Sequence, residues 1–159
     1  MMASKDFIIV HTLSERRTIH GDDIKIERSE NRMLKKYVGN DEHVIIPDGI
    51  HTIGPRAFEK CEHMKSVLIP DSVKTIGAAS FSECIHLESV RIPRGVKTLG
   101  GSAFSECTNL RSAVFEGEIP WYGCDPRVFW GCPHLTIYAS KDSYIKRYAK
   151  HYKIPFVAI

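Results

Sequence analysis

Three histidines each lie two residues after a cysteine, and these two residue types are common ligands of zinc in proteins. They are His63, His86 and His134. If the fold brings two of these imidazoles together, the pair could bind a metal ion or sense pH, because like-charged rings lower each other's pKa. Asn109 fills the corresponding position after Cys107, which favours a solvated corner that accepts any small polar residue. Both interpretations stay open at the level of the sequence.

The cysteines offer a second chemistry, because paired thiols form disulfides and exposed thiols cross-link chains. Free cysteine behaves as a small hydrophobe, and parallel side chains oppose the disulfide torsion, so we expect a column of buried thiols. Cys124 lies outside the pattern, and we expect it in an exposed loop where it could link two chains. Its spacing to His134 fits no recognised zinc motif, so neither a metal nor a cofactor is predicted. The expected column contains Cys61, Cys84, Cys107 and Cys132.

Motifs that carry catalysis or nucleotide binding are missing from the sequence. It contains no G-x-S-x-G, Walker A, G-x-G-x-x-G or H-E-x-x-H motif. Glu59, Glu83 and Glu106 recur near the cysteines, but repeated carboxylates are more typical of a solvated surface than of a general acid and base. We therefore predict a non-enzymatic protein without catalytic residues.

The composition narrows the class of protein further. The chain has 159 residues, of which 43% are hydrophobic and 26% charged, and this suits one compact soluble domain. There are 22 Lys and Arg against 19 Asp and Glu, spread along the chain, so no nucleic-acid partner is predicted. No apolar run reaches the roughly 18 residues of a membrane span, and Lys5 and Asp6 precede only a short apolar stretch. We expect no membrane insertion and a cytoplasmic location, with the cell surface or secretion as the alternative.

An internal repeat of 23 residues must position all of these side chains. A fourth, degenerate copy runs through Phe129 and Cys132 and carries an insertion of two residues. Four copies exceed the roughly three that a solenoid needs for stability. The 23-residue interval is shown by Pro47, Pro70 and Pro93, by Gly54, Gly77 and Gly100, and by Phe58, Phe81 and Phe104.

Each copy predicts one short strand and one turn. The segment 64–69 alternates between apolar and polar residues and is closed by Pro70, which has no N–H for a strand ladder. Gly54 and its equivalents permit a turn, and the A-F-x-x-C pattern that follows predicts about one turn of α-helix or 3-10 helix. One coil is too small to bury its own apolar side, so the coils must stack. The interior columns are predicted to be Val67, Val90 and Ala113; Ile69, Ile92 and Phe115; and Phe58, Phe81, Phe104 and Phe129.

The combined pattern, L-x-x-V-x-I-P-x-x-V-x-x-I-G-x-x-A-F-x-x-C, resembles the BspA-like subfamily of leucine-rich repeats over residues 33–139. The sequence departs from the pattern at Met64, at Ser80 and in the loop 121–126. The resemblance implies an α/β repeat fold, a right-handed leucine-rich repeat solenoid. It also implies adhesion or interaction surfaces, which members of this subfamily often display on bacterial cells.

The two ends of a solenoid need covering segments, because they expose apolar rungs. We expect a single domain over 1–159, with an N-terminal β cap over 1–45, about four repeats over 46–139, and a C-terminal cap of helix and strand over 140–159.

Specific elements are expected in both caps. Short strands are predicted at 7–11 and 24–27, and Asp142 can cap a helix over 143–151 that stops before Pro155. One face of this helix is predicted to carry Ile145, Tyr148, Ala149 and Tyr152.

The outward positions of the strands form two candidate binding rows. Small serines admit a partner's backbone, and exposed apolar rows mark interaction sites, so these rows predict a protein partner of unknown identity. The alternative is a strand preference for such residues with nothing bound. The rows are His43, Ser66, Ser89 and Ser112, and Ile45, Leu68, Arg91 and Val114.

A second candidate surface is the loop that begins with Trp121 and Tyr122, together with Trp130. These aromatic side chains either seal the last coil or project as a binding patch. Three functions are therefore carried forward. They are a protein-binding module, a structural unit that assembles into homo-oligomers through a sheet edge or Cys124, and a metal protein or enzyme using His63 and His86.

Overall fold

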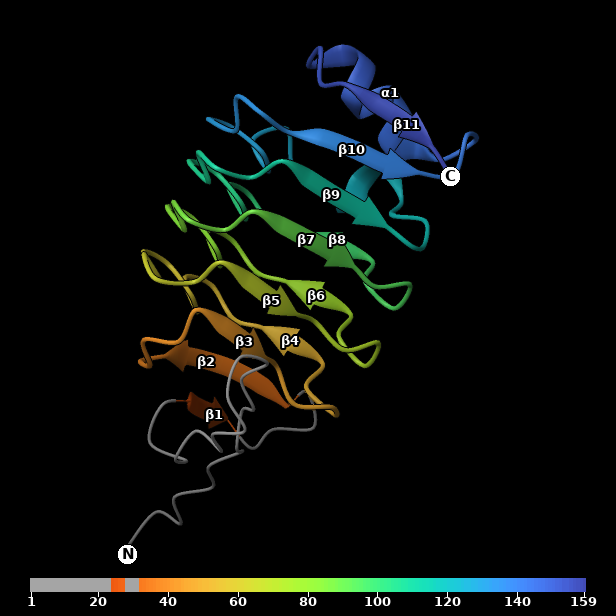
Figure 1. Cartoon of the computed structure of the whole chain (residues 1–159). Helices are drawn as coiled ribbons and strands as arrows, with labels where there is room; N and C mark the ends of the chain where they lie inside the picture. The colour runs from red at the N-terminus through yellow and green to blue at the C-terminus, as the bar shows by residue number, and fades with distance from the viewer. Residues whose placement is uncertain (1–23, 28–31) are drawn as a thin grey trace, which may run out of the picture.

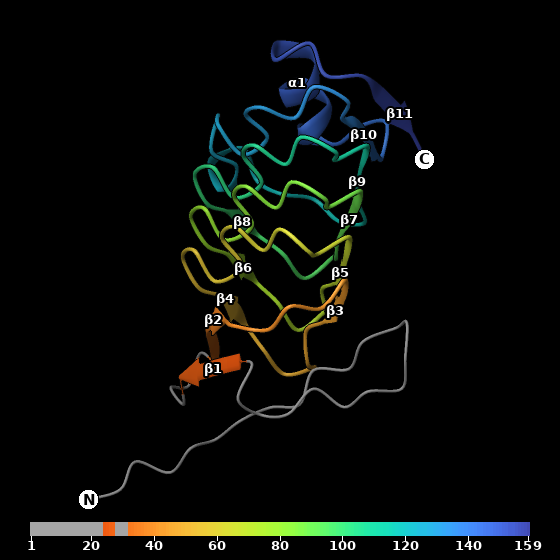
Figure 2. The same cartoon turned by 60° about the vertical axis from the view of Figure 1, so that its left-hand side comes forward.

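The computed structural model of the chain describes residues 24–27 and 32–159 (Figure 1). The strand predicted at 7–11 lies outside the described residues. The described chain winds into about five stacked turns. One β-sheet lies on each of two sides of the stack (Figure 2). No helix in the described ranges is long and apolar enough to cross a membrane.

The strand predicted in each copy is present and belongs to a six-stranded sheet. All neighbouring strands of this sheet run parallel, because each coil returns the chain to the same side one level further along. In spatial order the strands are β11 (Phe156–Ala158), β10 (Thr136–Ala139), β9 (Ser112–Phe115), β7 (Ser89–Ile92), β5 (Ser66–Leu68) and β3 (His43–Ile45).

A second sheet corrects the expectation of one strand per copy. Three of its five strands, at 52–53, 75–76 and 98–99, contain only two residues each, which is too short for an alternating pattern to be seen in the sequence. The expected strand at 24–27 is present and pairs antiparallel with its neighbour, whereas the other pairs are parallel. The order is β1 (Ile24–Glu27), β2 (Met33–Tyr37), β4 (Thr52–Ile53), β6 (Thr75–Ile76) and β8 (Thr98–Leu99).

The helical turn predicted for A-F-x-x-C is wrong. Arg56 and Lys60 have φ angles of 57° and 60°, and a residue in this left-handed region cannot continue a right-handed helix. The backbone bonds instead to the next coil, where Phe58 N–H donates to the Ser80 carbonyl over 2.7 Å. The equivalent left-handed residues in the following coils are Ala79, Glu83, Ser102, Glu106 and Gly131.

The predicted aromatic column is confirmed. Phe81 stacks on Phe58 and Phe104 with ring centroids 4.9 and 5.0 Å apart, and Phe129 follows Phe104 at 5.6 Å. Tyr37 from β2 extends the column, with its ring centroid 5.2 Å from that of Phe58. The other two interior columns predicted from the repeat, which begin with Val67 and Ile69, are also buried.

One buried polar side chain in the described core makes no hydrogen bond. Ser80 is fully buried, and its hydroxyl is the single buried side-chain polar atom without a partner in the described part of the chain. The corresponding positions of the neighbouring coils hold Ala57 and Ala103. The departure from the repeat pattern at Ser80 therefore places an unpaired hydroxyl in a site that suits alanine.

The substitution Ser80→Ala is expected to raise the free energy of unfolding by about 1–2 kcal/mol, because it removes a desolvated hydroxyl that makes no hydrogen bond. Urea denaturation followed by circular dichroism measures the change. Ser82→Ala is the matched control, because Ser82 is also buried but its Oγ lies 2.9 Å from that of Ser105, so this substitution should be destabilising. A loss of stability in Ser80→Ala would contradict the prediction.

The described C-terminal segment contains a 3-10 turn, η1 (Trp121–Gly123), and one helix, α1 (Tyr144–His151), followed by β11. The helix lies where it was expected, but its N-cap residue is Ser143 rather than Asp142, and Ser143 makes no side-chain cap hydrogen bond. Ile145, Tyr148 and Ala149 are buried, as predicted. Tyr152 was predicted on the same face but follows the helix and is 42% exposed.

Candidate functional site

The six-stranded sheet brings each of the two predicted rows into one line. Backbone register places His43 beside Ser66, Ser66 beside Ser89, and Ser89 beside Ser112. The same ladders align Ile45 with Leu68 and Arg91 with Val114. Because parallel strands in register keep equivalent side chains on the same face, the candidate residues form two parallel lines across the coils.

The second row extends further than the sequence indicated. Val114 pairs with Tyr138 of β10, and Tyr138 pairs with Val157 of β11. Leu68 and Val157 are 40% and 42% exposed. Both added residues were missed because the fourth copy is interrupted by the insertion, although the alternation in T-I-Y-A was a usable signal for Tyr138. We call this line the β-face row: Ile45, Leu68, Arg91, Val114, Tyr138 and Val157.

Arg91 interrupts the β-face row with a charge that is locally compensated. Its Nε donates to Glu116 Oε1 over 2.5 Å, and this hydrogen bond raises the pKa of Arg91. Glu116 lies directly after β9, so the ion pair spans two coils. A partner would therefore meet a neutral pair at this point rather than an isolated cation.

The serine row contains one histidine contact. His43 Nδ1 lies 2.8 Å from Ser66 Oγ, the spacing of a base and a hydroxyl nucleophile. Within the described residues no carboxylate is hydrogen-bonded to His43, so the third member that would orient such an imidazole is missing there. The pair fits a surface hydrogen bond that links two coils.

The other histidines lie apart from any ligand cluster. His63, His86 and His134 are all exposed, as expected for a solvated corner. Over residues 24–27 and 32–159, no three side chains of the His, Cys, Asp and Glu types are grouped so that they could hold a metal ion. The Asn109 amide, at the same position, donates to the Ile85 carbonyl over 2.7 Å.

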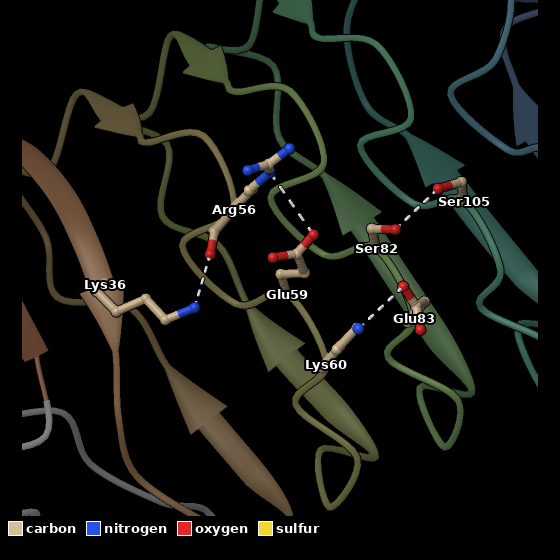
Figure 3. A network of polar contacts seen from close by, with 7 residues as sticks. All are labelled: Lys36, Arg56, Glu59, Lys60, Ser82, Glu83 and Ser105. Carbon is tan, nitrogen blue, oxygen red and sulfur yellow. Dashed lines mark hydrogen bonds and ion pairs between the residues drawn. The ribbon is translucent and has the colours of Figure 1, made fainter.

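Two of the three recurring carboxylates are paired with cations (Figure 3). Glu59 Oε1 lies 3.7 Å from Arg56 Nε, and Glu83 Oε1 lies 3.8 Å from Lys60 Nζ. These contacts are at the turn edge of the coils, where solvent screens them and each contributes little to stability. The arrangement supports the prediction of a solvated surface.

The predicted cysteine column is present, and its thiols are free. The Sγ atoms of Cys84, Cys107 and Cys132 each donate to a phenylalanine carbonyl of the preceding coil over 3.1 Å. Cys84 and Cys107 are fully buried, whereas Cys61 and Cys132, at the two ends, are half-buried. Hydrogen bonds with the neighbouring thiols, together with burial, raise the pKa of Cys107, which fits a structural thiol.

The expectation of an exposed Cys124 is wrong. This residue is half-buried, packs against the core, and forms an isolated β-bridge with Leu99. Burial raises the pKa of its thiol to about 12, so little reactive thiolate forms near neutral pH. The bridge is parallel and joins residues 25 apart, which is the repeat interval plus the two inserted residues, so Cys124 takes the next rung beside β8 and lies inside.

The aromatic loop does not seal the last coil with all of its side chains. Tyr122 is 76% exposed and Trp130 is 66% exposed. The backbone of Trp121 begins η1, but its side chain lies outside the described part of the structure. Beside Trp130 there is a pocket of about 470 Å³ between the last coil and the C-terminal segment, and Tyr148 and Tyr152 line it.

The fold is shared with known proteins. A family model described as BspA type leucine rich repeat region (6 copies) matches residues 35–152. Among solved structures, a leucine rich repeat protein of T. pallidum gives a TM-score of 0.53 at 17% identity, covering 74% of this chain and 69% of that protein. The pneumococcal vaccine antigen PcpA gives 0.59 at 15% identity, covering 79% of this chain and 38% of that one.

A leucine rich cell surface protein of Faecalibacterium prausnitzii gives a TM-score of 0.55 at 19% identity, covering 87% of this chain and 39% of that protein. The chain thus spans less than half the length of the pneumococcal and Faecalibacterium proteins. A comparison with curated proteins gave no match. At these identities the structural similarities show the fold alone.

Proposed function

The chain belongs to the family of BspA-type leucine-rich repeat proteins, and from this premise we propose that it is a non-enzymatic module that binds another protein through its β-face row. The observation that carries the proposal is that six neighbouring parallel strands each contribute one residue to that row. Backbone ladders pair Ile45 with Leu68, and join Arg91, Val114, Tyr138 and Val157 in turn, while the ladder between β5 and β7 ends one residue earlier, at Val67 and Val90. A rigid line of mostly apolar side chains costs little conformational entropy on binding, because the sheet already holds it in place.

The serine row supports the same surface. Its small side chains lie next to the apolar line, so a partner's backbone could approach closely there. The Arg91–Glu116 ion pair lies at the same face and offers one polar contact that fixes orientation. Shape complementarity and the burial of apolar surface would then supply affinity, and this ion pair would determine how the partner is oriented on the surface.

A homo-oligomeric structural unit is the second candidate, and one observation favours it. Among the described residues, β3 and β11 are the end strands of the six-stranded sheet, and a strand edge without a neighbour there is a template for pairing with another chain. The burial of Cys124 removes the other support for this candidate, which was cross-linking through an exposed thiol.

We include a cytoplasmic location in the proposal. Its support is the set of five free cysteines, which suits a reducing compartment. The description of the Faecalibacterium protein as a cell surface protein favours the alternative location. Antibody labelling of intact and of lysed source cells separates the two, and labelling of intact cells would overturn the cytoplasmic proposal.

The binding proposal is tested by affinity capture from a lysate of the source cells with the double variant Leu68→Glu/Val114→Glu. Two carboxylates in the row would remain unpaired when a partner covers them, so we expect the recovered partner to fall at least about tenfold. The control variant Val38→Glu/Thr98→Glu adds the same charge at exposed positions beside the second sheet and should leave capture unchanged. Circular dichroism checks that both variants are folded.

Equal capture by the row variant and the control would contradict the β-face row as the binding surface. Analytical ultracentrifugation of the purified chain distinguishes the second candidate. A stable dimer that dissociates in the row variant would show that this face pairs two copies of the chain instead.

A further inference from the structure

The C-terminal end of the solenoid carries a groove that is separate from the β-face row. Two hollows of about 470 and 430 Å³ adjoin each other, and Pro126, Tyr148 and Tyr152 line both. One wall is the loop of the last coil and the other is α1 with the residues that follow it. We call the pair of hollows the end groove.

The walls of the end groove are aromatic and held in place by contacts of their own. The Tyr148 hydroxyl donates to the Pro126 carbonyl over 3.1 Å, which ties the helix to the loop. The Tyr148 ring meets Phe129 edge-on at 6.2 Å and Tyr152 at 4.7 Å. Trp130 lines the larger hollow and remains 66% exposed, so an indole face is available in a site that is already formed.

The charge of the end groove differs between its two hollows. Arg147 and His151 line the smaller hollow, and α1 contains no acidic residue. In the described part of the chain no carboxylate pairs with Arg147. No charged side chain of the described ranges lines the larger hollow, and the Glu106 carboxylate lies outside the lining, against Gly131.

The side chains that line the end groove indicate which kind of ligand it could bind. Exposed tryptophan and tyrosine rings flanked by proline bind proline or aromatic side chains of extended peptides, which lose little entropy on binding. The guanidinium of Arg147, which pairs with no carboxylate among the described residues, complements a carboxylate, whereas the larger hollow is lined by uncharged side chains. Two adjoining hollows suit two anchors of one extended segment rather than a single compact ligand.

We propose that the end groove binds an extended peptide segment of a partner protein. A proline or aromatic residue of the segment fills the hollow beside Trp130, and an acidic residue a few positions away pairs with Arg147. This site is independent of the β-face row, so the chain would have two binding surfaces.

The test is selection of a phage-displayed library of random dodecapeptides on the purified full chain, with the variant Arg147→Glu as the counter-selection target. We expect enrichment of peptides that combine an acidic residue with proline or an aromatic residue. Synthetic copies, labelled for fluorescence anisotropy, should bind at least about tenfold more weakly to Arg147→Glu and to Tyr152→Ala. Replacing the peptide's acidic residue by its amide should cause a similar loss.

Two control measurements show whether a loss of binding comes from the end groove itself rather than from the β-face row or from unfolding. The variant Leu68→Glu/Val114→Glu should bind the selected peptides with unchanged affinity, because its substitutions lie on the other surface. Arg147 and Tyr152 are both exposed, and circular dichroism melting checks that their variants stay folded. The proposal is overturned if no peptide is enriched over Arg147→Glu, if the enriched peptides lack acidic residues, or if phenylacetate alone binds with the same dependence on Arg147 and Tyr152.

Discussion

Replacing Phe81 by alanine is expected to lower the free energy of unfolding by about 3–5 kcal/mol. The ring is fully buried and stacks almost parallel on both neighbours, with interplanar angles of 4° to Phe58 and 2° to Phe104. The substitution therefore removes two ring–ring contacts and leaves a cavity in the middle of the column. In a solenoid each coil is stabilised mainly by its neighbours, so both interfaces of this coil are weakened together.

Urea denaturation followed by circular dichroism measures the effect of Phe81→Ala. The control is Trp130→Ala, which also removes an aromatic ring, but one that is 66% exposed, and it should cost less than about 1 kcal/mol. A similar loss of stability in the two variants would show that the column is not the source of stability that its packing indicates.

The substitution Gly100→Ala is the second large expected effect, a loss of about 2–3 kcal/mol or failure to fold. A Cβ on Gly100 would lie 2.5 Å from the Ala78 nitrogen and 2.7 Å from the Gly77 carbonyl carbon, both backbone atoms of the preceding coil. Backbone cannot swing aside as a flexible side chain does. The two coils would have to separate, and the hydrogen bond from Gly100 N–H to the Ile76 carbonyl, now 2.8 Å, would lengthen.

Gly101 provides the matched control at the neighbouring position. The atoms nearest to a Cβ there belong to the Asp125 carboxylate, the first at 3.2 Å, and a side chain can shift by a few tenths of an ångström where backbone cannot. Gly101→Ala should therefore cost less than about 1 kcal/mol. Thermal melting monitored by circular dichroism compares the two variants, and equal melting temperatures would disprove the role assigned to close coil approach.

The structure gives a different reason for the glycine that recurs in each copy than the sequence did. The sequence indicated that Gly54, Gly77 and Gly100 allow a turn that other residues resist. None of the three has a positive φ angle in the structure. The glycines are required because successive coils come so close that there is no room for a side chain.

The sequence by itself determined the repeat, the strands of the larger sheet, the aromatic and cysteine columns, and which side chains point outward. All of these follow from a fixed interval and from period-two alternation, which are local properties of the chain. A residue such as Leu68 points outward because Val67 and Ile69 beside it point inward, and no distant contact is needed to decide this.

Only the tertiary structure decided the features that depend on contacts between coils. The left-handed turn residues such as Lys60 replace the predicted helix because the backbone there bonds to the next coil. Cys124 is inside because it pairs with Leu99 of the preceding coil, and the end groove exists because α1 packs against the last coil. The repeat interval indicates which residues of successive coils pair with each other, whereas the insertion interrupts this interval and the C-terminal segment lies beyond the last copy. Their positions therefore depend on packing that no local pattern records.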